Sequence, residues 1–354
     1  MAQSDTRTAT HAPIKVGIAG LGRSGWAIHA DALALLPGQF SVVAACDPDP
    51  ERQQEAEERF RCRACAGIAG LVADDEIELM VVATPSQLHA ADTISALRSG
   101  KHVLVEKPMA RSLAEVDKMI AVAEETGQIL TVNQNYRYAA DFWKVKEIVE
   151  SGVLGRVVQI RIAVHQFRRR WDWQTLKAYG GGILNNHGAH VVDWAMRLVD
   201  DPDPEVFCHM ETTPLYAGDA ESHVKVILRP RNGPLVDIEL THACAYPQEK
   251  WLVMGTQGSL TSDRKIIRWR YFDPEEAPPL VLDTRPTPDR SYNSEELPWR
   301  EETWESDLDF AGDVQRLYRD LYATIREGAP LAITPESVRR QVAILEKCRE
   351  LSPV

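Results

Sequence analysis

The sequence has none of the features typical of a membrane, secreted or nucleic-acid-binding protein. No apolar run within its 354 residues approaches the ~18–20 residues that span a bilayer. Residues 1–13 are small and polar and lack the apolar core of a signal peptide, so we expect a flexible tail there. The formal net charge of −12 argues against nucleic acid or an anionic membrane as the main partner.

Cysteine is scarce and is not arranged as a framework. Six cysteines scattered along the chain argue against disulfides and favour a reducing, cytoplasmic compartment. Cys62 and Cys65 form C-x-x-C, and His187 and His190 form H-x-x-H, but neither pair has partners at zinc-site spacing. We therefore expect no metal site.

A glycine-rich turn near the N-terminus is the most informative motif that is present. The apolar strand Ile14–Ala19 runs into G-x-G-x-x-G, and a helical stretch, Arg23–Leu36, follows. In a dinucleotide-binding turn the first glycine permits the tight bend and the second lets the backbone approach a pyrophosphate, while the third allows close helix packing. The residues expected to line this turn are Gly20, Leu21, Gly22, Arg23, Ser24 and Gly25. A glycine-rich turn in some other α/β protein is the alternative.

Asp47 indicates which dinucleotide is bound. It ends the second expected strand, Phe40–Cys46, and stands 22 residues after Gly25. A carboxylate at this place accepts a hydrogen bond from a ribose 2′-hydroxyl and repels a 2′-phosphate. The next residues, Pro48-Asp49-Pro50, include no arginine, so NAD is predicted in preference to NADP.

Strands and helices alternate through residues 14–138, which predicts a Rossmann domain with a doubly wound parallel sheet. Gly100 and Gly127 are typical of helix ends in this region. The remaining expected strands are Leu79–Ala83, His102–Val105 and Ile129–Val132, and the remaining expected helices are Pro50–Phe60, Ala90–Ser99 and Leu113–Glu125.

The pattern changes after Phe142, and residues 139–334 are predicted to form an α+β domain with an open, mostly antiparallel sheet flanked by helices. One helix is expected after the Gly180–Gly182 run, and the proline-rich stretch Pro274–Pro298 is expected to be a surface loop. The expected strands are Val157–Phe167, Ser222–Leu228, Leu235–Thr241, Lys250–Met254 and Lys265–Tyr271. Helices are expected at Asp307–Glu327 and at Pro335–Glu350, the latter within a closing segment, 335–354.

Polar side chains follow three of the expected parallel strands. Open α/β sheets bind ligands at the carboxyl ends of their strands, so these residues should rim the cleft beside the nicotinamide. They are Thr84, Pro85 and His89 after the first strand, Glu106 and Lys107 after the second, and Asn135, Tyr136 and Arg137 after the third.

Together these motifs resemble the glucose–fructose oxidoreductase, inositol dehydrogenase and rhizopine-catabolism oxidoreductase family, Gfo/Idh/MocA. The resemblance extends from Ile14 to Ser352 and includes the triple glycine followed by Gly188, His190 and Asp193. It implies hydride transfer between NAD and a sugar, inositol or related polyol. It also implies that Lys107 and His190 are the catalytic residues.

The resemblance implies further site residues. Thr84, Pro85, His89, Glu106, Lys107, Asn135 and Arg137 would contact the cofactor. Asn186 stands where many members have aspartate, and it is expected to orient substrate with Lys107 and His190. Trp173, His165 and Tyr136 are further substrate candidates, although strand alternation leaves the direction of His165 open.

Other functions stay open at this point. A glycosidase that oxidises its sugar transiently would use the same Lys107 and His190, and some relatives are non-catalytic, ligand-sensing regulators. The Arg168–Arg170 run suits a solvated loop, a subunit contact or a substrate contact. The open face of the second sheet predicts a homodimer or homotetramer.

Overall fold

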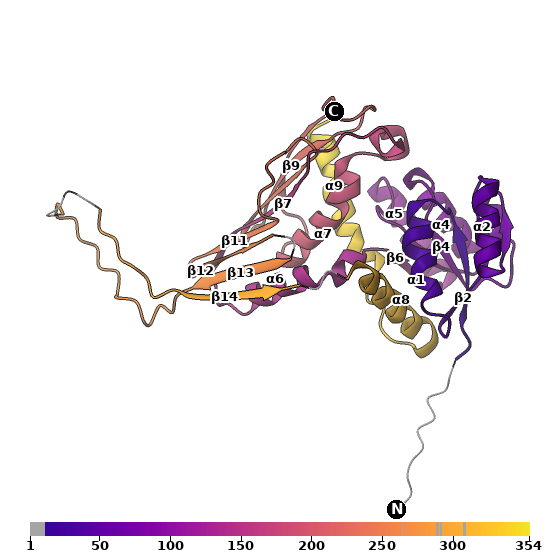
Figure 1. Ribbon diagram of the computed structural model, residues 1–354, viewed down its shortest axis with the longest axis horizontal. Helices are drawn as coiled ribbons and strands as arrows, with labels where there is room; N and C mark the ends of the chain where they lie inside the picture. The colour runs from indigo at the N-terminus through magenta and orange to yellow at the C-terminus, as the bar shows by residue number, and fades with distance from the viewer. Residues whose placement is uncertain (1–10, 264, 288–289, 291, 307–308) are drawn as a thin grey trace, which may run out of the picture.

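The computed structural model describes residues 11–263, 265–287, 290, 292–306 and 309–354, and these form two sheets with helices between and around them (Figure 1). Of the expected tail, residues 1–13, the structure describes only residues 11–13. The first sheet lies at one end of the molecule and the larger second sheet at the other.

The N-terminal sheet has six parallel strands in the order β3-β2-β1-β4-β5-β6, which confirms the predicted Rossmann fold. Its strands are β1 Ile14–Ala19, β2 Phe40–Cys46, β3 Arg63–Cys65, β4 Leu79–Val82, β5 His102–Val105 and β6 Leu130–Val132. Its helices are α1 Asp31–Ala34, which continues the π-helix Gly25–Ala30, then α2 Pro50–Phe60, α3 Ile68–Val72, α4 His89–Arg98 and α5 Leu113–Thr126. The sequence analysis missed β3 and α3 because both are shorter than the stretch of chain over which a periodic pattern can be recognised.

The second sheet has eight strands in the order β14-β13-β12-β11-β7-β10-β9-β8. All neighbours are antiparallel except β7 and β10, so the predicted, mostly antiparallel sheet is confirmed. Its strands are β7 Val157–His165, β8 Glu205–Glu211, β9 His223–Arg229, β10 Leu235–Thr241, β11 Trp251–Gly255, β12 Gly258–Ser262, β13 Ile266–Tyr271 and β14 Arg300–Glu305.

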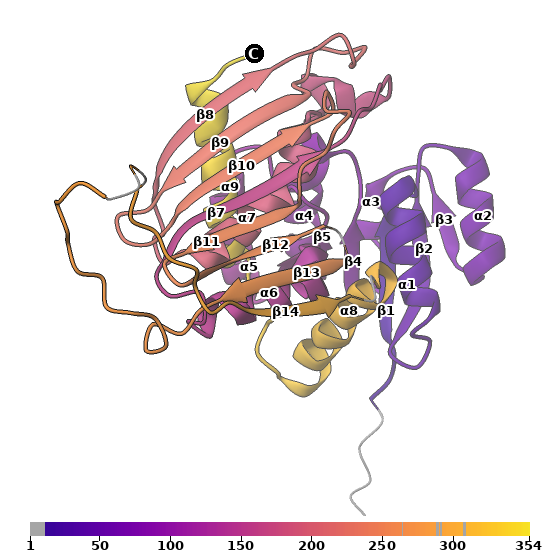
Figure 2. The same ribbon diagram turned by 60° about the vertical axis from the view of Figure 1, so that its left-hand side comes forward.

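Helices cover one face of this second sheet. The helices α6 Ala140–Glu150, α7 Ala189–Leu198 and α9 Pro335–Leu351 lie between it and the Rossmann sheet (Figure 1), and Figure 2 shows the strands in front of them. Even-numbered residues of β10, such as Ile238 and Leu240, are fully buried on the helix side, whereas Glu239 is only partly buried. The sheet therefore has one apolar face and one charged face.

The last two helices tie the two halves of the molecule together. Helix α8, Phe310–Glu327, packs Leu317 and Tyr318 into the core of the Rossmann domain, although the sequence analysis placed it with the second domain. The predicted start at Asp307 falls on residues 307–308, which lie outside the described residues. Helix α9 contributes Val338 to the first core and Leu345 to the second.

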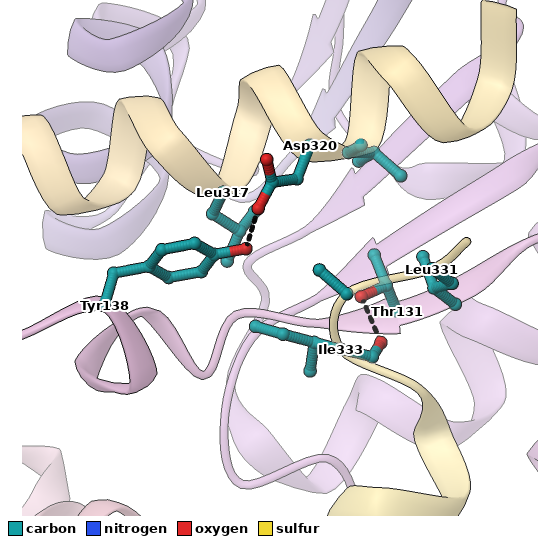
Figure 3. A pocket seen from close by; sticks show the side chains of 8 residues that line it. Thr131, Tyr138, Leu317, Asp320, Leu331 and Ile333 are labelled. Carbon is teal, nitrogen blue, oxygen red and sulfur yellow. Dashed lines mark hydrogen bonds between the residues drawn. The ribbon is translucent and has the colours of Figure 1, made fainter. Parts of the chain in front are cut away.

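A small cavity marks the contact between α8 and the Rossmann sheet. Beside it the Tyr138 hydroxyl donates to Asp320 at 2.5 Å, and the Thr131 hydroxyl donates to the Ile333 carbonyl at 2.7 Å (Figure 3). At about 10 Å³ it has room for about one water molecule. It is therefore part of the packing and not a substrate site.

Candidate active site

The glycine turn has the shape that a dinucleotide requires. Gly20 has a φ of +89°, and a Cβ on it would lie 2.6 Å from the Ala83 carbonyl oxygen. A Cβ on Gly25 would lie 1.8 Å from the Gly20 oxygen, so both positions exclude a side chain. A Cβ on Gly22 would meet nothing within 4 Å, which leaves open space beside this backbone. The turn therefore fits a pyrophosphate.

Asp47 is buried at the carboxyl end of β2, beside that turn. Its carboxylate accepts from the Leu21 N–H at 2.8 Å and from the Asp49 N–H at 3.0 Å, which fixes its orientation. Arg52, one turn into α2, lies 3.5 Å from the Asp47 carboxylate. The sequence analysis missed Arg52 because it examined only the residues that directly follow Asp47.

Glu106 holds the end of β5, immediately before Lys107. Its carboxylate accepts from Asn133 at 2.8 Å and from the Lys107 backbone N–H at 3.0 Å, and it contacts His29 at 3.1 Å. Burial alone would raise the pKa of Glu106, but the hydrogen bond and charge of His29, with the charge of Lys107, lower it to about 2. Glu106 is therefore an ionised side chain that is already fully engaged and holds the Lys107 backbone.

Lys107 extends from β5 to the helical segment that precedes α7. Its Nζ lies 3.2 Å from the Asn186 carbonyl oxygen and 3.4 Å from the Asn186 side-chain oxygen. Burial lowers the pKa of Lys107; Glu106 raises it and Arg23 lowers it further. The neutral amine, the form that can accept a proton, is therefore more accessible than in an ordinary lysine.

His190 lies on the same helical segment, one turn beyond Asn186. Its ring stacks on Tyr136 with centroids 3.9 Å apart, and its Nδ1 lies 3.2 Å from the Gln134 side-chain oxygen. Gln134 donates its amide to the Ala189 carbonyl, so its oxygen is left to accept from His190. Burial, followed by the charge of Lys107, holds the pKa of His190 well below its usual value. The neutral ring therefore has its proton on Nδ1 and a lone pair on Nε2.

Asn186 and His187 lie in a π-helical turn, Leu184–Gly188, that runs directly into α7. Such turns widen a helix and are frequent at functional sites. Here the turn brings the Asn186 side-chain amide to 3.5 Å from the Gln174 oxygen while its own oxygen meets Lys107. Asn186 therefore connects the lysine to the loop that precedes the triple glycine.

The triple glycine fits against a buried carboxylate that the sequence analysis missed. Gly182 has a φ of +104°, and a Cβ on it would lie 2.0 Å from a Glu221 oxygen. The same carboxylate accepts from the Leu184 N–H at 3.0 Å and so holds the start of the π-helical turn. Burial raises the pKa of Glu221 to about 7. No local pattern marks Glu221, because it lies 39 residues after Gly182 and outside any strand.

Two expected cofactor residues are engaged in internal contacts. The Arg137 guanidinium donates to both carboxylate oxygens of Asp193, at 2.8 and 2.5 Å, and to the Ser337 hydroxyl at 2.7 Å. His89 contacts the Thr84 and Pro108 carbonyls, each at 2.8 Å. These contacts hold the walls of the cleft in place.

The remaining cofactor candidates, Thr84, Pro85 and Asn135, differ in the contacts that their side chains make. The Thr84 hydroxyl donates to Asp92 at 2.7 Å, and Pro85 leads into the short helix Ser86–Leu88. The Asn135 side-chain nitrogen is buried and has no hydrogen-bond partner within the described residues. Asn135 is therefore the candidate with an unmet donor.

The substrate candidates are divided between two places. Tyr136 stacks on His190, and Trp173 is 43% exposed on the loop that also holds Gln174. His165 instead lies 3.0 Å from Glu239, whose side chain is on the charged face of the sheet and also accepts from Lys225. The structure therefore does not bring His165 to Lys107.

Two kinds of feature are not found among the described residues. Within them, no three or more His, Cys, Asp or Glu side chains are placed together to hold an ion. The helices described for this chain include none that is both long and apolar enough to cross a bilayer.

The fold and this site define a two-domain oxidoreductase that binds a nicotinamide dinucleotide in its Rossmann domain. Comparison with family models agrees: the oxidoreductase family with an NAD-binding Rossmann fold matches residues 14–134, and the GFO/IDH/MocA C-terminal domain matches residues 142–261. The chain belongs to the Gfo/Idh/MocA oxidoreductase family.

Individual relatives support this assignment. The chain is 26% identical to scyllo-inositol 2-dehydrogenase (NADP(+)) IolW of Bacillus subtilis, over 96% of this chain and 94% of that one. It is 28% identical to myo-inositol 2-dehydrogenase of Thermotoga maritima, over 71% and 75%. Its fold is similar to that of the WlbA dehydrogenase of Bordetella pertussis in complex with NADH and UDP-GlcNAcA, with a TM-score of 0.77, 22% identity and 96% coverage of both chains.

Proposed function

We propose that the protein transfers hydride between NAD and a CH–OH group of a sugar, inositol or related polyol. The observation that carries this proposal is the position of the Lys107 amine, which lies beside Asn186 and whose charge affects the pKa of His190. The two inositol dehydrogenases among the relatives support the substrate class.

The cofactor would be held by the glycine turn, by Asp47 and by the unmet amide donor of Asn135. When bound, the nicotinamide ring supplies a hydride acceptor or donor. Asp47 favours NAD through the ribose 2′-hydroxyl. Arg52 beside it is the feature that could tolerate a 2′-phosphate, so we propose a preference for NAD and not an absolute selection.

Lys107 and His190 would handle the proton that the hydroxyl loses. In the oxidising direction the carbon gives up a hydride and the oxygen gives up a proton, and a neutral Lys107 amine accepts that proton. The lone pair on His190 Nε2 can accept or relay the same proton. Asn186 cannot take a proton, so it would orient Lys107 and a substrate hydroxyl.

A substrate panel tests this proposal. Sugars, sugar acids and inositols are offered to the full chain with NAD, and formation of the reduced cofactor is followed by absorbance. At least one member should be oxidised with a stoichiometric yield of NADH. Release of an aglycone without net NADH would instead identify the glycosidase alternative.

We also propose that two copies associate through the charged face of the second sheet. This face has no covering helix within the described residues, and Lys225 there pairs with Asp237 and Glu239. Light scattering should give the mass of a dimer or tetramer, and the mass of a monomer would contradict this assembly.

A further inference from the structure

We propose that the active-site cleft has an anion-binding wall, formed by His187, His242 and Arg168, that recognises a carboxylate or phosphate group on the substrate. This inference rests on the proposed function, because it assigns the substrate a charged group in addition to its hydroxyls.

The three residues come from different segments but lie together. His187 directly follows Asn186 in the π-helical turn, and its ring meets the His242 ring edge-to-face, with centroids 5.9 Å apart and planes at 84°. The Arg168 backbone N–H donates to the His242 carbonyl at 3.0 Å, so Arg168 and His242 are neighbours on adjacent segments. The wall is therefore continuous with the residue that contacts the Lys107 amine.

One buried polar atom of this wall is left without a partner. The Tyr216 hydroxyl contacts His242 Nδ1 at 2.8 Å, but His242 Nε2 is buried and has no hydrogen-bond partner within the described residues. The His187 ring makes no hydrogen bond in the described part of the chain. A buried polar atom without a partner is costly, and an anionic oxygen bound here would give His242 Nε2 a partner.

Arg168 gives the wall its positive charge, because both histidines are neutral near pH 7. Burial is the main cause that lowers the pKa of His187 to about 3, and the charges of Lys107, His242, Arg170 and Arg168 contribute to the same value. Burial also lowers the pKa of His242 to about 4, again with help from Arg170 and Arg168. Lys107 is beside Glu106 and Arg170 pairs with Asp172, which leaves Arg168 as the cation without an acidic partner within the described residues. In a chain with a net charge of −12, this is a local reversal of sign that attracts anions.

Arg168 is the cation available to a ligand. Arg170 already donates to Asp172, at 2.9 and 2.7 Å, and to Gln174 at 2.6 Å. The exposed Arg168 has no acidic partner within the described residues, and a guanidinium can hold two oxygens of a carboxylate or phosphate at once. Neutral His187 and His242 add single N–H donors, whereas a cationic substrate would be repelled.

Calorimetric titration of the full chain loaded with NADH tests the wall without requiring turnover. The probes are D-glucose, D-glucuronate, D-glucose 6-phosphate and inorganic sulfate. At least one anionic probe should bind the wild-type protein about tenfold or more tightly than glucose does. Glucuronate, glucose 6-phosphate and sulfate separate a carboxylate site from a phosphate site.

Arg168→Ala should remove that preference, and Arg168→Lys should restore part of it. Arg169→Ala is the matched control, because Arg169 is the adjacent arginine and is also exposed but is not one of the main charges acting on His187 or His242. His242→Asn should also weaken binding of the anion without changing the affinity for NADH. Circular dichroism checks that each variant is folded.

The proposal is overturned if no anionic probe binds more tightly than glucose, or if Arg168→Ala binds the anions as the wild type does. This failure is distinct from failure of the proposed function. The latter would appear as the absence of NAD reduction with every polyol and acid of the substrate panel, whatever the calorimetry shows.

Discussion

The side-chain oxygen of Asn186 lies 3.4 Å from Lys107 Nζ. A neutral amide leaves the charge of the buried amine uncompensated on that side, and burial lowers the pKa of Lys107. We therefore expect the pKa of Lys107 to be lower with Asn186 than it would be with a carboxylate at this position.

Asn186→Asp should move the pH dependence of turnover. A carboxylate near Nζ favours the ammonium form, so the pKa of Lys107 should rise. The neutral amine then appears only at higher pH, and the acidic limb of the kcat/KM profile should move upward by about one pH unit. Asn186→Ala is the control: it should reduce kcat/KM without moving that limb upward. If the acidic limb does not move in Asn186→Asp, the side chain at position 186 does not influence the group whose titration causes that limb.

Asp47→Ala should weaken NAD binding and relax cofactor choice. The loss of a charge-assisted hydrogen bond to the ribose predicts about a tenfold increase in the Kd for NADH. NADPH should gain affinity relative to NADH, because the carboxylate no longer repels a 2′-phosphate and Arg52 stays in place. Arg52→Ala should lower the affinity for NADPH alone. Fluorescence titration of both cofactors measures these changes, and equal loss for both cofactors in Asp47→Ala would contradict the assignment.

Glu221→Gln should change how stability depends on pH. The folded-state pKa of Glu221 is raised to about 7, from an ordinary value of 4.5. The folded protein therefore binds a proton that the unfolded chain releases, so this group's contribution to stability is complete below pH 4.5 and is lost as the pH rises toward 7. The total difference is about 3 kcal/mol.

The glutamine variant cannot titrate and should lack this loss. Urea unfolding between pH 5 and 8 should show the wild type losing stability relative to Glu221→Gln as the pH rises. Glu211→Gln, on the exposed edge strand β8, is the matched control and should follow the wild type. Parallel curves for the wild type and Glu221→Gln would contradict a raised pKa.

The parts of the site that could be predicted are those encoded by neighbouring residues. The glycine turn, Asp47 and Lys107 each follow an apolar strand directly, and parallel strands bring their carboxyl ends to one edge. Long strands with alternating burial, such as β9 and β10, were found for the same reason. By contrast β14 reads Arg-Glu-Glu-Thr-Trp-Glu and is mostly exposed, so it has no alternation to detect.

The parts that could not be predicted depend on contacts between distant residues. Arg137 meets Asp193 across 56 residues, and Glu221 meets Leu184 across 37. The direction of His165 depended on the register of β7 against β10, which pairs it with Thr241 and brings it to Glu239. Neither composition nor periodicity contains this information.

The most direct test of the account compares Lys107→Ala with the wild type, using a substrate from the panel. Turnover should fall by about 10²–10⁴-fold, because the group that accepts the hydroxyl proton is removed, while the Kd for NADH stays within about twofold. Lys118→Ala, an exposed lysine on α5, is the control and should be fully active. If Lys107→Ala retains wild-type turnover, the proton is handled elsewhere and the central claim is wrong.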